Sequence, residues 1–247
     1  MKEELILGSK LRTTAPAAFG AWRWDCRSLL FRINSLWIRL KLIVRDEIRS
    51  FHLEMGFFAL ALVGLNWPLL HGSCNTALIF MPEPVRHGEW WRVAAHPFIH
   101  VTWFHLLLDG TAFFLLYNEL REHGWKKRAV FGLASGAGSL LVPLWAEPML
   151  AVNGLCGLSG IAHGLMAVSA LEMVNKSQDV VLRRLGLFSF LLLLFKCLAE
   201  ALSGKMLFSF LYFGLVGEPI AVTHAGGLLG GAVAWLFMRL YYRAPKS

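Results

Sequence analysis

The chain has 247 residues, of which 56% are hydrophobic and only 16% are charged, so its composition excludes an ordinary soluble domain. Its formal net charge is +8, and basic residues collect on the cytoplasmic side of membrane proteins, so membrane topology explains this excess better than nucleic-acid binding does. We therefore expect an all-α polytopic membrane protein that has the lipid bilayer, and no nucleic acid, as its partner.

Residues 1–50 form the first predicted unit, a cytoplasmic N-terminal region. Within it, residues 27–50 carry apolar side chains at roughly helical spacing with arginines interleaved, and Trp37 adds an aromatic side chain. This pattern is typical of a basic amphipathic helix that lies on a membrane surface. A nucleic-acid-binding arm is the alternative, but the apolar stripe favours lipid.

Six apolar segments of roughly spanning length follow, given that about 20 residues cross a bilayer as a helix. Pro68 and Pro143 are expected to interrupt the first and the third segment. We predict one six-span membrane domain over residues 51–241 and a cytoplasmic tail over residues 242–247. The segments lie near residues 55–71, 93–117, 129–147, 154–173, 185–203 and 221–240.

Lysines and arginines alternate along these segments in a way that orients them. Ten of them precede residue 55, and the connections around residues 121–128 and 176–184 and the end from residue 239 carry four, three and three. The loops on the other side hold only three. The positive-inside rule therefore predicts that both termini are cytoplasmic.

Polar and ionisable side chains inside the second, fourth and sixth segments mark the candidate site, because such groups are costly in a membrane and are commonly functional. These three segments run from outside to inside in the predicted topology, so each group lies in the outer part of its span. The topology thus predicts that a nucleophile and several bases meet at one membrane depth. The groups are His96, His100, His105 and Asp109 in the second segment, Ser159 and His163 in the fourth, and His224 in the sixth.

The candidate nucleophile lies in the string Gly157-Leu158-Ser159-Gly160, where a helix is expected to begin. Glycines let the backbone approach closely, and a helix N-terminus offers unpaired N–H groups to a developing oxyanion. A serine needs a base, and His224 is the best candidate because the glycines after it let the sixth helix pack tightly on the fourth. The alternatives are a serine bonded only to its own helix and a glycine face that serves only packing.

Motif strings follow one another in a specific order on three of the segments. They are Trp91-Arg92 followed by His96, His100, His105 and Asp109; then Gly157-Leu158-Ser159-Gly160; and then His224 with Gly227 and Gly231. These strings resemble the WR, HxxxHxxxxHxxxN, GxSG and HxxGxxxG motifs of the rhomboid family of intramembrane serine proteases. The resemblance covers most of the membrane domain, and it implies a six-helix bundle of the basic bacterial form and hence a bacterial inner membrane.

The resemblance also implies a role for each matching residue. Ser159 would be the nucleophile and His224 the general base, in a dyad without a third carboxylate. His105 would hold the oxyanion together with the Ser159 backbone N–H, supported by Gly157. Asp109 stands where the family commonly has Asn. Because an ionised carboxylate cannot donate a hydrogen bond, Asp109 either stays protonated and donates one or, as we favour, orients His105.

His163 lies four residues after Ser159 and hence on the same helix face, where the family often has Tyr. We expect its ring to pack against His224, and we favour this over a role as the base. The string over residues 157–165 resembles the rhombosortase subgroup, which is thought to process proteins with a C-terminal Gly-Gly motif, an apolar span and a basic end. The resemblance therefore implies transmembrane protein substrates.

The histidines His96, His100, His105 and His224 also raise a zinc site, since histidine is the commonest metal ligand. The sequence contains no HExxH string, and zinc would leave the GxSG string unexplained, so we predict neither metal nor cofactor. His96 and His100 are instead expected to be interfacial side chains that support the first loop.

Two pairs outside the motifs carry further expectations. Lys196 and Glu200, four residues apart in the fifth segment, are expected to form an intramembrane ion pair. Cysteines with no CxxC spacing favour free thiols over metal ligation, with a disulfide between Cys74 and Cys156 as the alternative.

Two other functions are weighed against the intramembrane endopeptidase. A catalytically impaired rhomboid-like protein that binds transmembrane clients is supported only by Asp109. A small transporter would explain the intramembrane ionisable residues, but the sequence has no visible inverted repeat.

Overall fold

The computed structural model describes residues 48–120, 123–207, 213 and 220–243. These residues belong to one compact unit, Arg45–Ser247. They are helical apart from loops and an isolated antiparallel bridge between Phe80 and Leu155, which confirms the predicted all-α class. The predicted amphipathic helix over residues 27–50 lies outside the described residues, except for its last three.

Six helices of 17 to 24 residues stand out among the described residues, and each overlaps one of the predicted apolar segments. The last turn of the first helix is the 3-10 segment η1, Trp67–His71. The bounds of the six helices are Ile48–His71, α4 Trp103–Glu119, α5 Trp125–Ala146, α7 Ser159–Lys176, α8 Val180–Ser203 and α9 Val222–Arg243.

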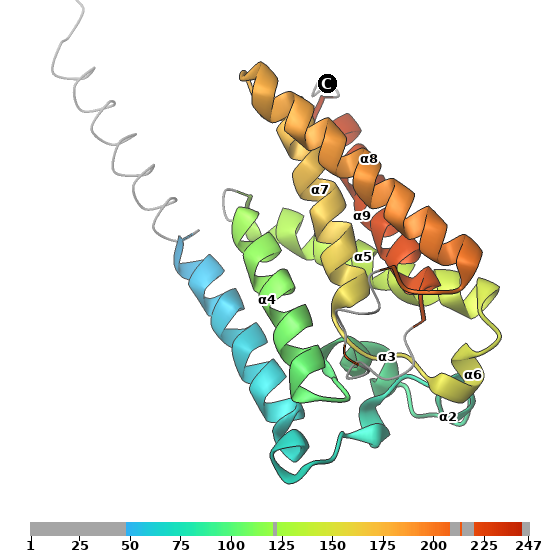
Figure 1. The fold of residues 1–247 in the computed structure, drawn as a ribbon. Helices are drawn as coiled ribbons and strands as arrows, with labels where there is room; N and C mark the ends of the chain where they lie inside the picture. Colours follow the sequence, from blue (N-terminus) through green and yellow to red (C-terminus); the bar gives the residue numbers. More distant parts are fainter. Residues whose placement is uncertain (1–47, 121–122, 208–212, 214–219, 244–247) are drawn as a thin grey trace, which may run out of the picture. The chain divides into compact units, whose positions relative to one another are not determined.

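Short helices fill the connections before α4 and before α7. They lie at the end of the bundle where α4 and α7 begin (Figure 1). Four of them precede α4, and the fifth follows α5. They are η2 Thr76–Leu78, α2 Pro82–Arg86, α3 Trp91–Ala95, η3 His96–Phe98 and α6 Leu150–Asn153.

Length and composition qualify three of the described helices as candidate membrane spans: Ile48–His71, α5 and α8. The bent pair Trp91–Phe98 and α4 makes a fourth if it counts as one span. Helices α7 and α9 do not qualify, and polar residues such as His163 and Glu172 in α7 and His224 and Arg239 in α9 interrupt their apolar sequences. The number of six spans therefore stays a prediction.

The second predicted segment is broken rather than continuous. Its two parts, Trp91–Phe98 and α4, meet at an angle of 90°. Pro97 lies in the first turn of η3, and the Thr102 side chain accepts the His105 N–H at 3.1 Å, which starts a new helix at this point. Of the four ionisable residues expected in one span, His105 and Asp109 lie on α4, and His96 and His100 precede it.

The two prolines expected to interrupt their segments do not end the helices. Pro143 lies inside α5, which continues to Ala146. Pro68 lies in the first turn of η1, where a missing N–H costs no hydrogen bond, so the first helix continues as a 3-10 turn to His71.

The apolar core lies between the first helix, α4, α5, α7 and α9. Phe113, Phe131 and Leu165 are among its buried side chains. At the core, the buried guanidinium of Arg128 on α5 forms an ion pair with Glu54 of the first helix, with 2.7 Å between Nη2 and Oε1. A buried charge needs such a partner, so this pair ties the first helix to α5.

Helix α9 packs with its backbone directly against α5 and α7. A Cβ atom at Gly227 would overlap the carbonyl oxygen of Gly160 on α7, and one at Gly230 would overlap that of Ala134 on α5. Only glycine permits such contact between backbones, as in small-residue seams between membrane helices. The glycines after His224 thus bring α9 onto α7, as the sequence predicts.

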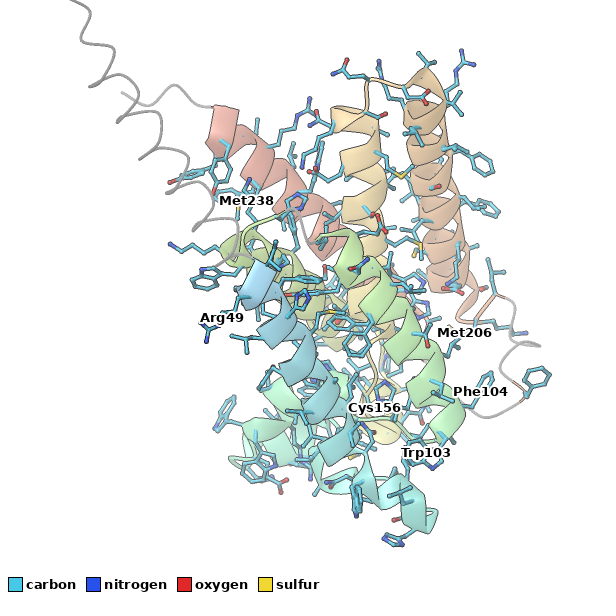
Figure 2. The ribbon with its side chains drawn as sticks, turned by 90° about the vertical axis from the view of Figure 1, so that its left-hand side faces the viewer. Arg49, Trp103, Phe104, Cys156, Met206 and Met238 are labelled. Carbon is cyan, nitrogen blue, oxygen red and sulfur yellow. The ribbon has the colours of Figure 1, made fainter. Side chains whose placement is uncertain are left out.

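Chain direction places the candidate residues at one end of the bundle. Helices α4, α7 and α9 all begin at the end where α8 finishes (Figure 1). Trp103, at the start of α4, and Cys156, just before α7, lie toward this end, whereas Met238 on α9 lies toward the other (Figure 2). The first turns of α7 and α9 and the last turns of α8 can therefore contribute to one site.

Gly230→Ala tests the backbone contact between α9 and α5. The added methyl group would overlap Ala134 O, and overpacking of this kind costs about 1–3 kcal/mol, so we expect a lower midpoint of thermal unfolding in detergent. Gly132→Ala on α5 is the matched control, because nothing lies within 4 Å of its added Cβ, and its midpoint should stay or rise. Equal midpoints for the two variants would contradict the proposed seam.

Candidate active site

The loop over residues 154–158 sets the position at which α7 begins. Its Leu155 exchanges two backbone hydrogen bonds with Phe80, of 2.9 and 3.0 Å. The Gly157 N–H donates to the carbonyl of His96 at 3.1 Å. Gly157 has a φ of +100°, a conformation that glycine adopts at little cost. The loop is thus tied to the chain before α4, and α7 begins at Ser159, as the motif predicts.

Asp109 contacts both groups that were expected to hold the oxyanion, the Ser159 backbone N–H and the His105 ring. Its Oδ2 accepts the Ser159 backbone N–H at 3.0 Å and lies 3.2 Å from His105 Nε2. A Cβ atom at Gly157 would lie 2.8 Å from each of these two side-chain atoms, so only glycine fits beside them. The contact with His105 agrees with an orienting role for Asp109. The contact with the Ser159 N–H was not expected, and it places a carboxylate at the N-terminus of α7, where negative charge is favourable.

His100 and His96 are two further buried histidines near this cluster. His100 Nε2 lies 3.6 Å from Asp109 Oδ2, and its ring meets that of His105 edge-on at 4.9 Å between centroids. His96 supports the loop before α7 through its carbonyl oxygen, while its ring contacts Phe80. Phe80 belongs to the first loop, so this ring contact agrees with the expected support of that loop by His96. His100 instead faces Asp109.

Two groups of side chains among the described residues bring enough ligand atoms together to hold a metal ion. One contains His100, His105 and Asp109. The other contains His163, His224 and Glu200, a side chain of α8. The four histidines considered for zinc in the sequence are therefore divided between different clusters, and His96 belongs to neither group.

His224 stacks on His163, as predicted. The two rings are parallel within 8°, and their centroids lie 3.8 Å apart. His163 Nδ1 lies 2.7 Å from the Ser159 carbonyl oxygen, so this nitrogen carries the proton and donates it. Among the described side chains, the Ser159 hydroxyl makes no hydrogen bond to either ring. The stack places the first turn of α9 beside the first turn of α7.

A carboxylate lies against His224, and the sequence analysis did not place it in the site. Glu200 Oε2 is 2.7 Å from His224 Nδ1, and the Glu200 side chain is fully buried. Lys196 Nζ lies 2.8 Å from the same oxygen, which confirms the expected ion pair, and 3.0 Å from His163 Nε2. A carboxylate thus lies beside His224, where the resemblance implied none.

A signal for this partner was present in the sequence. The fifth segment runs from inside to outside in the predicted topology, so Lys196 and Glu200, in its second half, lie on the side of the membrane predicted for Ser159 and His224. An ion pair in a membrane span is costly and is therefore a functional candidate. Their spacing of four residues predicts only that Lys196 and Glu200 pair with each other. The partnership with His224 depends on how α8 packs against α9, which the sequence does not give.

The cysteine alternatives are also resolved. Cys74 and Cys156 are both free thiols in the structure, so the possible disulfide between them is not formed. Cys156 lies in the loop directly before α7 (Figure 2).

Fold and site together define a helical membrane protein in which three helices bring a serine, two histidines and a carboxylate to one end of the bundle. A sequence model of the family described as Rhomboid domain matches residues 87–241. The chain therefore belongs to the rhomboid family, whose members are typically intramembrane serine proteases, and it is an integral membrane protein. No curated protein and no solved structure matches the chain significantly.

Gly157→Ala tests whether Asp109 and His105 lie against the loop before α7. The added Cβ meets both side chains at 2.8 Å and is also strained by the positive φ. Gly88→Ala is the matched control, because Gly88 has nearly the same φ, +103°, with nothing within 4 Å of its Cβ. Backbone strain costs both variants about 1–3 kcal/mol, and we expect Gly157→Ala alone to lose a further 1–3 kcal/mol, roughly, in thermal unfolding. Equal losses would contradict this packing.

Proposed function

We propose that the chain is an intramembrane serine endopeptidase that cleaves membrane-anchored proteins, with Ser159 as the nucleophile and His224 as the general base. The observation that carries the proposal is the stack of His163 on His224, because His163 is bonded to the Ser159 carbonyl. This contact brings the GxSG string and the last histidine motif into one site. Membership of the rhomboid family supports the same chemistry.

The proposed reaction follows the general pattern of serine acyl transfer. Ser159 Oγ attacks the scissile carbonyl carbon while its proton passes to His224 Nε2. The tetrahedral intermediate then breaks the C–N bond, and the departing amine takes that proton. The Ser159 N–H and His105 Nε2 would hold the oxyanion. Water then hydrolyses the acyl-enzyme and regenerates the Ser159 hydroxyl.

The proposed setting is a bacterial inner membrane that the chain crosses six times, with both termini in the cytoplasm. The alternation of basic residues supports this topology. The site then opens to the outer side, where a transmembrane substrate would unwind and enter beside α8. Only 22% of the most apolar window of α8 is buried, so this helix presents a wide apolar face to lipid or to a substrate helix.

We further propose that the substrates are those of the rhombosortase subgroup, proteins with a C-terminal Gly-Gly motif, an apolar span and a basic end. The string over residues 157–165 supports this assignment, with His163 where rhomboids often have Tyr. The stack of His163 on His224 gives that histidine a physical role in the site.

Labelling with a fluorophosphonate probe tests the nucleophile and the base. The purified wild type should be labelled, Ser159→Ala should not, and His224→Ala should be labelled about 10²- to 10⁴-fold more slowly, the contribution of a general base. Ser169→Ala is the matched control, because Ser169 is another serine of α7. Labelling that survives Ser159→Ala would contradict the mechanism.

A membrane-anchored reporter with a Gly-Gly tail, cut by the wild type and not by Ser159→Ala, would support the substrate class.

Asp109 favours a second candidate function, a catalytically impaired rhomboid-like protein that binds transmembrane clients. An ionised carboxylate accepts hydrogen bonds only, and Asp109 Oδ2 takes the Ser159 N–H that an oxyanion would need. The intact serine and histidine favour the protease. The two functions differ in whether the wild-type Ser159 reacts with the probe.

Asp109→Asn separates competition for the oxyanion donors from a specific need for the carboxylate. The amide keeps the shape of the side chain, removes the negative charge and adds N–H donors. We expect Ser159 in this variant to be labelled at least as fast as in the wild type, because the competing carboxylate is gone. A large loss of labelling would contradict this and assign the carboxylate itself a role in the reaction. Wild-type protein that stays unlabelled, while Asp109→Asn is labelled, would favour the client-binding function.

A further inference from the structure

We propose that Glu200 of α8 is the positioning residue for His224, so that the site works as a Ser159–His224–Glu200 triad. The inference rests on the proposed protease function and adds a residue to it. Its basis is the distance of 2.7 Å between Glu200 Oε2 and His224 Nδ1, between side chains that are both buried.

The contact fixes which nitrogen of His224 can act as the base. A carboxylate only accepts hydrogen bonds, so His224 Nδ1 must carry the proton and donate it to Glu200. The neutral ring then has its lone pair on Nε2, the nitrogen that must receive the proton of the Ser159 hydroxyl. Glu200 thereby selects the tautomer that a general base needs, as the carboxylate of a serine-protease triad does.

One assignment of protons satisfies every contact of 3.0 Å or less in this cluster. The longer approach of Lys196 Nζ to His224 Nδ1, 3.4 Å, then joins two donors and makes no hydrogen bond. His163 Nδ1 donates to the Ser159 carbonyl, and His163 Nε2 accepts from Lys196, 3.0 Å away. Lys196 also donates to Glu200 Oε2, which accepts from His224 as well. His163 is consequently unable to take a second proton without losing the contact with Lys196. This leaves His224 as the base and His163 as the ring that holds its plane.

The surroundings of Glu200 suit a permanent carboxylate. Burying a charge is costly unless it is paired and hydrogen-bonded. Lys196 lies 2.8 Å from Oε2, and the backbone N–H of Leu207 donates to Oε1 at 2.9 Å. Both oxygens are therefore satisfied without a proton on the carboxyl group. When His224 becomes an imidazolium during the attack, the fixed negative charge beside Nδ1 stabilises it, and Glu200 itself stays unprotonated.

A matched control lies at the other end of α7. Glu172 is partly buried, whereas Glu200 is fully buried, and it too lies among polar partners: Lys176, His123 at 3.6 Å and Trp235 at 2.7 Å. It resembles Glu200 in its partners but contacts no residue of the candidate site. Glu172→Gln therefore reports what the loss of a buried carboxylate does to stability alone.

The first experiment measures the labelling of Ser159 by the fluorophosphonate probe in Glu200→Gln, Glu172→Gln and the wild type. We expect Glu200→Gln to lower the maximal labelling rate by about 10²- to 10⁴-fold, with the half-saturating probe concentration almost unchanged, as for loss of a triad carboxylate. Glu172→Gln should label like the wild type. If the wild type labels at Ser159 and Glu200→Gln labels equally fast, the inference is wrong while the proposed function stands.

A double variant separates positioning from stability. Glu200→Gln alone leaves Lys196 without its carboxylate, and an unpaired charge destabilises more than the loss of both partners. Lys196→Met/Glu200→Gln removes both charges, so its unfolding midpoint should recover toward that of the wild type. Its labelling should stay slow. Labelling that recovers together with stability would assign Glu200 a purely structural role and overturn the inference.

A spectroscopic readout does not depend on activity. A histidine Nδ1–H that donates to a carboxylate gives a proton resonance far downfield of the amides. We expect this resonance in the ¹⁵N-histidine-labelled wild type and in Ser159→Ala, and its loss in Glu200→Gln and His224→Ala. Its presence in a wild type that the probe does not label would keep the contact and reject the protease. Its absence from the wild type would reject the contact itself.

Discussion

The contact of the α9 backbone with the backbones of α5 and α7 is the constraint on which the rest of the site depends. At Gly227 and Gly230 a methyl group would overlap a carbonyl oxygen of the neighbouring helix, so no other residue allows this approach. The first turn of α9 therefore lies against the first turn of α7, and His224 reaches the ring of His163 at 3.8 Å. Without the seam, ordinary side chains would separate α9 from α7, and the ring of His224 would not reach that of His163.

Much of the fold could be predicted from the sequence, because it follows from patterns along one helix at a time. Six apolar segments overlap six described helices, and the start of α7 at Ser159 follows from the glycines around it. The break between Trp91–Phe98 and α4 was missed, because a continuous apolar stretch hides a bend that hydrogen bonds create. Thr102 starts α4 by capping it, and neither hydropathy nor the presence of Pro97 fixes an angle of 90°.

The site was predictable where sequence neighbours determine it and unpredictable where packing does. His163 faces His224 because it lies one turn after Ser159, and the motif analysis gave that contact correctly. Glu200 was paired with Lys196, its neighbour on the same helix, although its shorter contact is to His224 on another helix. Spacing along one chain segment carries no information about which side of α8 faces α9. The predicted ion pair between Lys196 and Glu200 is therefore confirmed, but the prediction did not include the contact of Glu200 with His224.

The two carboxylates of the site lie where the proposed reaction would develop opposite charges. Attack on a carbonyl develops negative charge on the carbonyl oxygen and positive charge on the imidazole. Glu200 lies beside the imidazole of His224, where its negative charge would stabilise the cation that develops on the ring. Asp109 lies at the Ser159 N–H and beside His105, where the oxyanion would form, so an ionised Asp109 repels it. In the proposed reaction, Glu200 would therefore lower the barrier, and Asp109 would raise it until the carboxylate moves away from the Ser159 N–H or takes up a proton.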